Sequence, residues 1–125
     1  HYDHLDLEPV LDAAAALEIQ AAVPHVFVED TVLDYLLRIV TATRTEADFR
    51  NGVSTRGAIA LKTASQARAL LQGRDFVMPD DVVAMVAPVF THRLALAKYL
   101  ADPMEERRTV EAILKRIVDS LRQPS

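Results

Sequence analysis

Ser54 and Arg56 stand where side chains could bind a phosphate. They lie in "GVSTRGAIAL", residues 52–61, where a glycine and a serine precede an alanine-rich apolar pattern that predicts a helix. The first turn of a helix carries a positive partial charge, so a guanidinium there is unfavourable unless an anion lies nearby. Arg56 is therefore a candidate for contacting a polyphosphate, with Ser54 as a weaker helper. The alternative is a solvated arginine, or one paired with an acid such as Asp48.

Few other residues have types and spacing suited to chemistry. His92 and Arg93 follow a predicted helix and could face a neighbouring subunit. The histidines form no H-E-x-x-H pair, and His1 and His4 lie in a terminal segment, so we expect no metal site. The sequence has no cysteine, no G-x-x-x-x-G-K-[ST] loop and no G-x-G-x-x-G motif. The isolated chain is therefore not expected to be an enzyme.

Length and composition predict one all-α domain over residues 1–125. Half of the residues are apolar, aromatic residues make up 6%, and there are only three glycines. This composition suits helices with short connections better than a β-sandwich, which needs many turn residues. No apolar run approaches the roughly 20 residues that span a bilayer, and no signal peptide is visible. We expect a cytoplasmic protein without membrane insertion.

The charge is distributed unevenly along the chain. Residues 1–37 hold eight acids and no Lys or Arg, whereas residues 38–74 hold seven Lys/Arg against Glu46 and Asp48. This basic third could be a solvated face, could dock an acidic partner in a stand-alone protein-interaction module, or could bind nucleic acid. The net charge of −4 argues against nucleic acid. So does the six-residue spacing of the cations, which turns successive ones by about 120° on a helix.

Helical periodicity divides the chain into about five amphipathic helices around one core. The second helix carries the clearest stripe, at offsets of 3, 4, 7, 8 and 11 residues, formed by Val32, Tyr35, Leu36, Ile39, Val40 and Thr43. Residues 94–102 fit an extended stretch or a continued helix. The expected helices cover about residues 8–22, 29–44, 55–72, 79–90 and 103–122. They predict a small helical bundle.

Several charged residues are expected to have local structural roles. Arg44 ends a helix, where a cation is favourable. Arg74 is expected to tie its loop to Asp80 or Asp81, and both acids also suit the first turn of the helix that starts at Pro79. Glu111 and Lys115 have the spacing of a favourable helical pair.

Four further residues carry expectations about burial. Tyr35 and Met85 lie on apolar stripes and are predicted to be core positions. His25, between Pro24 and Val26, is expected to be partly buried in a connector. Phe49 stands in a polar segment and is a candidate for an exposed aromatic that docks on another domain.

The block from Gly52 to Leu94 resembles the C-terminal helical lid of MoxR-type AAA+ ATPases. The similarity covers about residues 7–94, and any one of its motifs is weak alone. Two positions depart from the family pattern, Thr55 for proline and Met78 for threonine. The matching elements are Thr43-Arg44, Gly52, Ser54, Arg56, Gly73-Arg74-Asp75-Phe76-Val77, Pro79-Asp80-Asp81-Val82 and His92-Arg93-Leu94.

This resemblance implies a function for the longer protein. The lid would present Arg56 as a second-sensor arginine to Mg²⁺-ATP bound on a P-loop domain of the same polypeptide. The family forms ATP-hydrolysing rings, often hexamers, with chaperone-like remodelling or maturation activity, often alongside von Willebrand factor A-type proteins. His92 and Arg93 could then contact neighbouring subunits. No bound cofactor is expected on the fragment itself.

Overall fold

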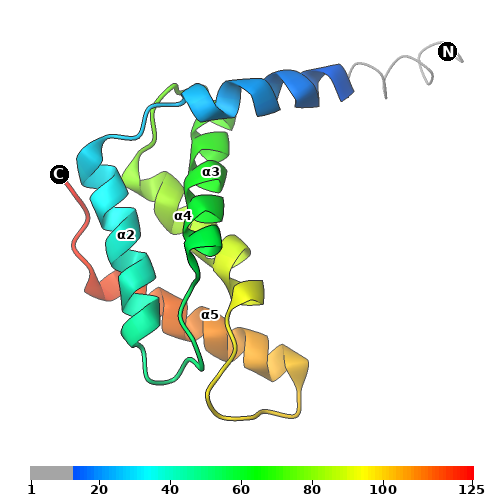
Figure 1. The fold of residues 1–125 in the computed structure, drawn as a ribbon, viewed down its shortest axis with the longest axis vertical. Coiled ribbons are helices and arrows are strands. Elements are labelled where there is room, and N and C mark those ends of the chain that lie inside the picture. The colour runs from blue at the N-terminus through cyan, green and yellow to red at the C-terminus, as the bar shows by residue number, and fades with distance from the viewer. Residues whose placement is uncertain (1–12) are drawn as a thin grey trace, which may run out of the picture.

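The computed structural model describes residues 13–125, and these residues form a bundle of helices without a β-sheet (Figure 1). His1, His4 and the start of the helix expected over residues 8–22 lie outside the described residues. Residues 13–22 are helical. The following elements are η1 (Val23–His25), α2 (Asp30–Thr45), α3 (Thr55–Leu71), α4 (Pro79–Phe90), η2 (Thr91–Arg93) and α5 (Pro103–Ser120). The predicted all-α class is confirmed.

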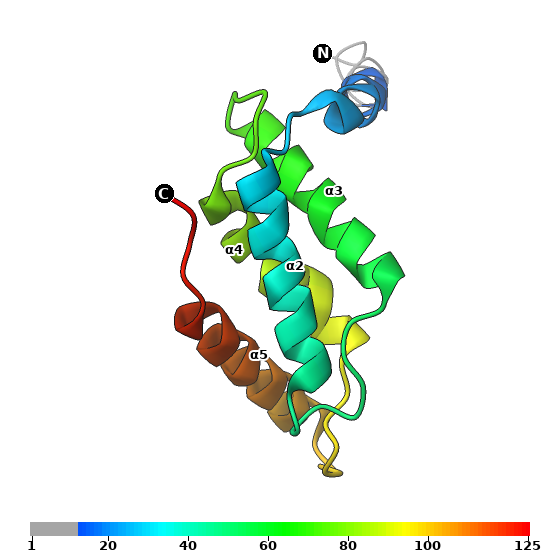
Figure 2. The ribbon, with the colours of Figure 1, turned by 60° about the vertical axis from the view of Figure 1, so that its left-hand side comes forward.

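The core lies between α2, α3, α4 and α5. In α2 every residue of the predicted stripe is buried, with Tyr35 and Ile39 completely inaccessible. α3 packs against α4, and α2 contacts the other three helices (Figure 2). Val82, Val86 and Phe90 of α4 bring its apolar face into the same cluster. The shared apolar core holds the start of α3 in place relative to α2 and η2.

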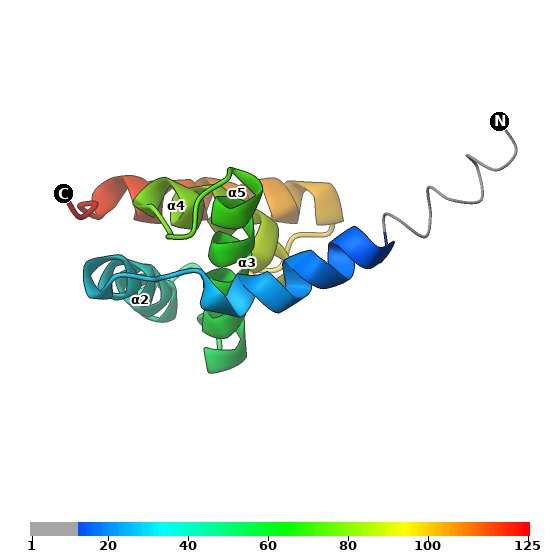
Figure 3. The same ribbon diagram turned by 90° about the horizontal axis from the view of Figure 1, so that it is seen from above.

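The helix formed by residues 13–22 extends away from the bundle, past the end of α3 (Figures 1 and 3). Most of its residues are exposed, including Leu17 at 65%. Pro24 lies inside the 3-10 turn that follows, so the helix ends as the sequence predicts. None of the described helices combines the length and the apolar character needed to cross a bilayer.

Two pairs of extended segments between the helices are joined by isolated β-bridges. Phe27 pairs with Phe76, and Phe49 pairs with Leu96 in an antiparallel bridge. The second pairing shows that the segment after η2 is extended rather than helical. It also buries Phe49, which is only 5% exposed, so the prediction of an exposed docking aromatic is wrong. Gly73 has a φ of +80°, the left-handed conformation expected after α3.

Two further expectations are corrected by the structure. His25 is exposed rather than partly buried, because its neighbours Val23 and Val26 fill the interior beside it. Lys115 bonds Asp119 at 2.8 Å instead of Glu111. Both acids are four residues from Lys115, and the sequence cannot tell which direction the lysine takes.

Candidate functional site

The last turn of α2 fixes the segment that leads into α3. Val53 is buried, and its N–H donates to the Thr43 hydroxyl at 3.1 Å. The Arg44 Nε donates to the Val53 carbonyl at 2.8 Å, which confirms a structural role for Arg44. A side chain at Gly52 would collide with the Arg44 backbone, so glycine is required for this approach. α3 therefore starts from a point held on both its backbone N–H and its carbonyl.

Ser54 is the N-cap of α3. Its hydroxyl accepts a hydrogen bond from the Gly57 N–H at 3.2 Å, as the sequence predicts for a capping serine. Helix geometry leaves the preceding N–H groups, those of Thr55 and Arg56, without intrahelical acceptors. Such groups and the helix dipole favour an anion at this point. The Ser54 oxygen only accepts in this cap, so its own O–H can still donate to an anion, and a weak contribution of Ser54 to phosphate binding stays a prediction.

Arg93 lies beside the start of α3. A Cβ atom at Gly57 would meet the Arg93 Cδ at 3.3 Å and would press on Val53, so the bare Gly57 backbone makes room for both. Arg93 is exposed, as is His92 next to it in η2. The sequence placed Arg93 at a possible subunit contact but did not predict its proximity to the helix that carries Arg56. The only signal for it is a glycine inside the first turn of an alanine-rich helix.

Arg56 projects from the first turn of α3 and is exposed. It makes no hydrogen bond or ion pair with any residue of the described range. Asp48, the acid considered as its partner, lies 3.8 Å from Arg116 instead, and Glu46 accepts a 3.0 Å hydrogen bond from the same guanidinium. Two exposed guanidinium groups, Arg56 on α3 and Arg93 on η2, thus lie at the start of α3, beside N–H groups that have no intrahelical acceptor. This arrangement can contact a multiply charged anion.

A second cluster of charge lies around the start of α4. Asp81 is fully buried and accepts hydrogen bonds from Arg74 at 2.6 and 2.7 Å, from Arg68 at 2.7 Å and from the Met78 N–H at 2.7 Å. Burial alone would raise the pKa of the Asp81 carboxyl, but the bonds from Arg74, Met78 and Arg68 outweigh it and lower the pKa to about 2. The predicted tie between Arg74 and an acid of this helix is confirmed. Asp81 is a structural anchor as well as a complement to the helix dipole.

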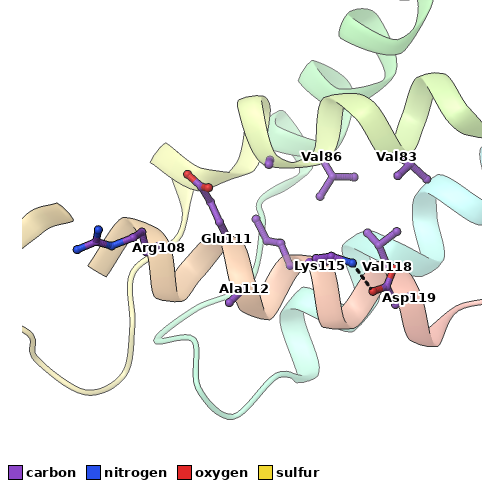
Figure 4. A pocket seen from close by; sticks show the side chains of 10 residues that line it. Val83, Val86, Arg108, Glu111, Ala112, Lys115, Val118 and Asp119 are labelled. Carbon is purple, nitrogen blue, oxygen red and sulfur yellow. Dashed lines mark hydrogen bonds and ion pairs between the residues drawn. The ribbon is translucent and has the colours of Figure 1, made fainter. Parts of the chain in front are cut away.

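A groove of about 550 Å³ lies between α4 and α5 (Figure 4). Its floor is apolar, with Val83 and Val86 facing Val118, and the Lys115–Asp119 pair lies along its edge. Neither Arg56 nor Arg93 lines it. Within residues 13–125, no three acidic or histidine side chains are grouped as metal ligands. The groove is therefore separate from the residues suited to anion binding.

Comparison with known proteins gives consistent matches. The family described as AAA lid domain matches residues 41–117. The chain is 36% identical over 121 residues to YeaC of Bacillus subtilis, covering 94% of this chain and 36% of that protein. It is 28% identical over 124 residues to chaperone MoxR1 of Mycobacterium tuberculosis, covering 92% and 32%. Over 71 residues it is 42% identical to MoxR of Paracoccus denitrificans, covering 57% and 19%.

A solved structure has the same fold. The crystal structure of a "putative ATPase" from Cytophaga hutchinsonii matches with a TM-score of 0.71 and 26% identity, covering 87% of this chain and 35% of that one. The chain spans about a third or less of the length of these relatives.

Proposed function

This chain belongs to the AAA lid domain family and is of the MoxR type, and we propose that it serves as the lid of an ATP-hydrolysing ring protein in which Arg56 contacts the phosphates of ATP. In this proposal the nucleotide and Mg²⁺ are held mainly by a P-loop domain of the same polypeptide. The single observation that carries the proposal is the exposed guanidinium of Arg56 at a capped helix start, without a partner among residues 13–125.

The surroundings of Arg56 suit this role because they are fixed before nucleotide binds. Thr43 and Arg44 hold Val53, and Ser54 caps α3, so the direction of the first turn is set by the bundle. The backbone that carries Arg56 is therefore already in position, which reduces the reorganisation needed to bring its positive charge to developing phosphoryl charge. A lysine would supply the charge but not the planar, directed donors of a guanidinium.

The proposal also includes contacts with neighbouring subunits and with partner proteins. His92 and Arg93 are exposed on η2 beside the start of α3. In a ring they would contact a neighbouring subunit, and their position would transmit the nucleotide state to it. One of the relatives is named a chaperone. A hexameric ring, chaperone-like remodelling and von Willebrand factor A-type partners would complete this function.

The decisive test is Arg56→Ala in the full-length parent protein. Losing a positive charge at the phosphates should lower ATP turnover roughly tenfold or more. Arg56→Lys should recover only part of the activity. Steady-state ATPase assays measure both effects, and circular dichroism should show an unchanged fold because Arg56 contributes nothing to the core.

Arg50→Ala is the matched control. Arg50 is also exposed, and its backbone N–H, rather than its side chain, bonds the Ala95 carbonyl at 2.8 Å. This variant should keep normal turnover. Unchanged hydrolysis in a folded Arg56→Ala protein would refute the role assigned to Arg56.

A further inference from the structure

Three large apolar side chains are exposed together at the end of the bundle where α3 ends and α4 begins. Phe27 is 63% exposed, Phe76 46% and Met78 39%. The first two lie on paired extended segments, joined by hydrogen bonds from the Phe27 N–H to the Asp75 carbonyl at 2.8 Å and from the Val77 N–H to the Phe27 carbonyl at 2.9 Å. Aromatic side chains on such a fixed backbone can bind a partner at little cost in conformational entropy.

Exposed carboxylates accompany these apolar side chains. Glu29 and Asp30 stand at the start of α2, Asp75 lies between α3 and α4, and Asp80 is in the first turn of α4. None of the four forms an ion pair with another residue of the range 13–125. We call Phe27, Phe76 and Met78 together with these four acids the end patch.

The nearby arginines do not neutralise the end patch. Arg68 and Arg74 both bond the buried Asp81, and Arg74 also lies over the Phe76 ring, 5.8 Å from its centroid. One of their two positive charges is matched by Asp81 itself. Lys62 of α3, which lines a hollow together with Phe27, adds one more cation. The four exposed carboxylates still outnumber the remaining positive charge, so the end patch has a net negative field.

The end patch is remote from the proposed nucleotide contact. α3 runs from Thr55 to Leu71, so its two ends are separated by about 25 Å at 1.5 Å per residue. Figure 1 shows the segment after α3 at the opposite end of this helix from its start. A partner on the end patch would leave Arg56 free.

We propose that the end patch docks a polypeptide segment with an apolar centre surrounded by Lys or Arg. Burial of exposed aromatic side chains supplies affinity, and complementary charge around them selects the partner and speeds its association. Within residues 13–125 no cation forms an ion pair with the four acids, and this favours a basic partner over an acidic or neutral one.

The proposal is tested by titrating the chain with short amphipathic helical peptides and recording amide NMR spectra. One peptide carries Leu on one face and Lys on the other, a second has Glu in place of Lys, and a third has Ser in place of Leu. Only the Leu/Lys peptide should bind, with shifts confined to residues 27–30 and 75–80. Its affinity should fall as salt is raised.

Variants separate the contribution of the exposed apolar side chains to peptide binding from that of the acidic side chains. Phe27→Ser with Phe76→Ser should weaken binding of the Leu/Lys peptide roughly tenfold or more. Asp75→Asn with Asp80→Asn should weaken it several-fold and reduce the salt dependence, without altering the apolar residues. Leu37→Ser is the matched control, because Leu37 is 47% exposed on α2 but lies outside the end patch.

Four results would overturn the proposal. The first is equal binding of the Leu/Glu or the Ser/Lys peptide. The second is a set of shifts centred on the groove between α4 and α5. The third is self-association of the chain through the end patch in place of peptide binding. Unchanged affinity in both folded double variants would overturn it as well.

Discussion

Asp81 is the buried charge on which the junction of α3 and α4 depends. Its carboxylate receives two arginines, one from α3 and one from the following loop, together with the N–H of Met78. The Met78 bond also explains why methionine is acceptable at the N-cap of α4. The cap is supplied by the carboxylate of Asp81, which reaches back from the first turn, as in a capping box.

Removing this carboxylate should be strongly destabilising. Asp81→Asn leaves Arg68 and Arg74 without their shared partner and should lower the free energy of unfolding by about 3 kcal/mol. Asp80→Asn is the control, since Asp80 is exposed and should cost less than about 1 kcal/mol. Urea unfolding at neutral pH measures both, and equal costs for the two variants would contradict the anchoring role.

The same bonds predict how stability depends on pH. The pKa of Asp81 is about 2 in the folded chain against an ordinary value of 3.8. The stabilisation is therefore fully present above about pH 4 and is lost as the pH falls through 2, and it amounts to roughly 2 kcal/mol. Urea unfolding at several pH values in this window should show the loss in the wild type and a flatter profile in Asp81→Asn.

The connection from α2 to α3 has a strict packing requirement at Gly52. Gly52 lies against the backbone of Arg44, so Gly52→Ala must displace either the segment around Gly52 or the last turn of α2. Overpacking of this kind costs about 1–3 kcal/mol. Since the shift occurs two residues before Ser54, we also expect lower ATP turnover in the full-length parent.

Gly73→Ala is the informative comparison for Gly52→Ala. Gly73 has a φ of +80° but open space around it, so alanine there introduces backbone strain without collision and should cost about 1 kcal/mol. Thermal unfolding of the two variants should give Gly52→Ala the lower midpoint temperature. ATP turnover should fall only in Gly52→Ala, and the reverse order would contradict the steric explanation.

The helices α2 to α5 were predictable from the sequence because each buries one face at helical spacing, whereas the helix of residues 13–22 leaves its apolar side chains largely exposed. The stripe of α2 matches the buried set residue for residue. The non-helical segments were not predictable in the same way. Burial of Phe49 depends on pairing with Leu96, a contact across more than forty residues that leaves no local pattern.

The candidate site was predictable only in its local part. The cap at Ser54 and the position of Arg56 follow from neighbouring residues in the chain. The arrival of Arg93 at Gly57 depends on how η2 folds back onto α3. Because this contact forms only in the folded bundle, the sequence alone does not predict that Arg56 and Arg93 lie where both could contact one anion.

The distribution of charge over the molecule limits how tightly the isolated chain can bind a nucleotide. The described part of the chain offers ATP two exposed guanidinium groups and one helix start on an open surface. Solvent-exposed ion pairs each contribute little, so the isolated chain should bind ATP with a Kd of about 1 mM or weaker. It should also hydrolyse no ATP, since the proposed function assigns tight binding and catalysis to a P-loop domain of a longer parent protein.

Amide NMR during an ATP titration of the isolated chain tests this limit directly. Shifts should concentrate on residues 54–57 and 91–93, and they should diminish in Arg56→Ala and in Arg93→Ala but persist in Arg50→Ala. Raising the salt concentration should abolish them, because the contact is electrostatic and exposed. Tight, salt-resistant binding or measurable turnover would mean that the chain contains a nucleotide site of its own. Shifts at the end patch instead would mean that the start of α3 does not attract the phosphates.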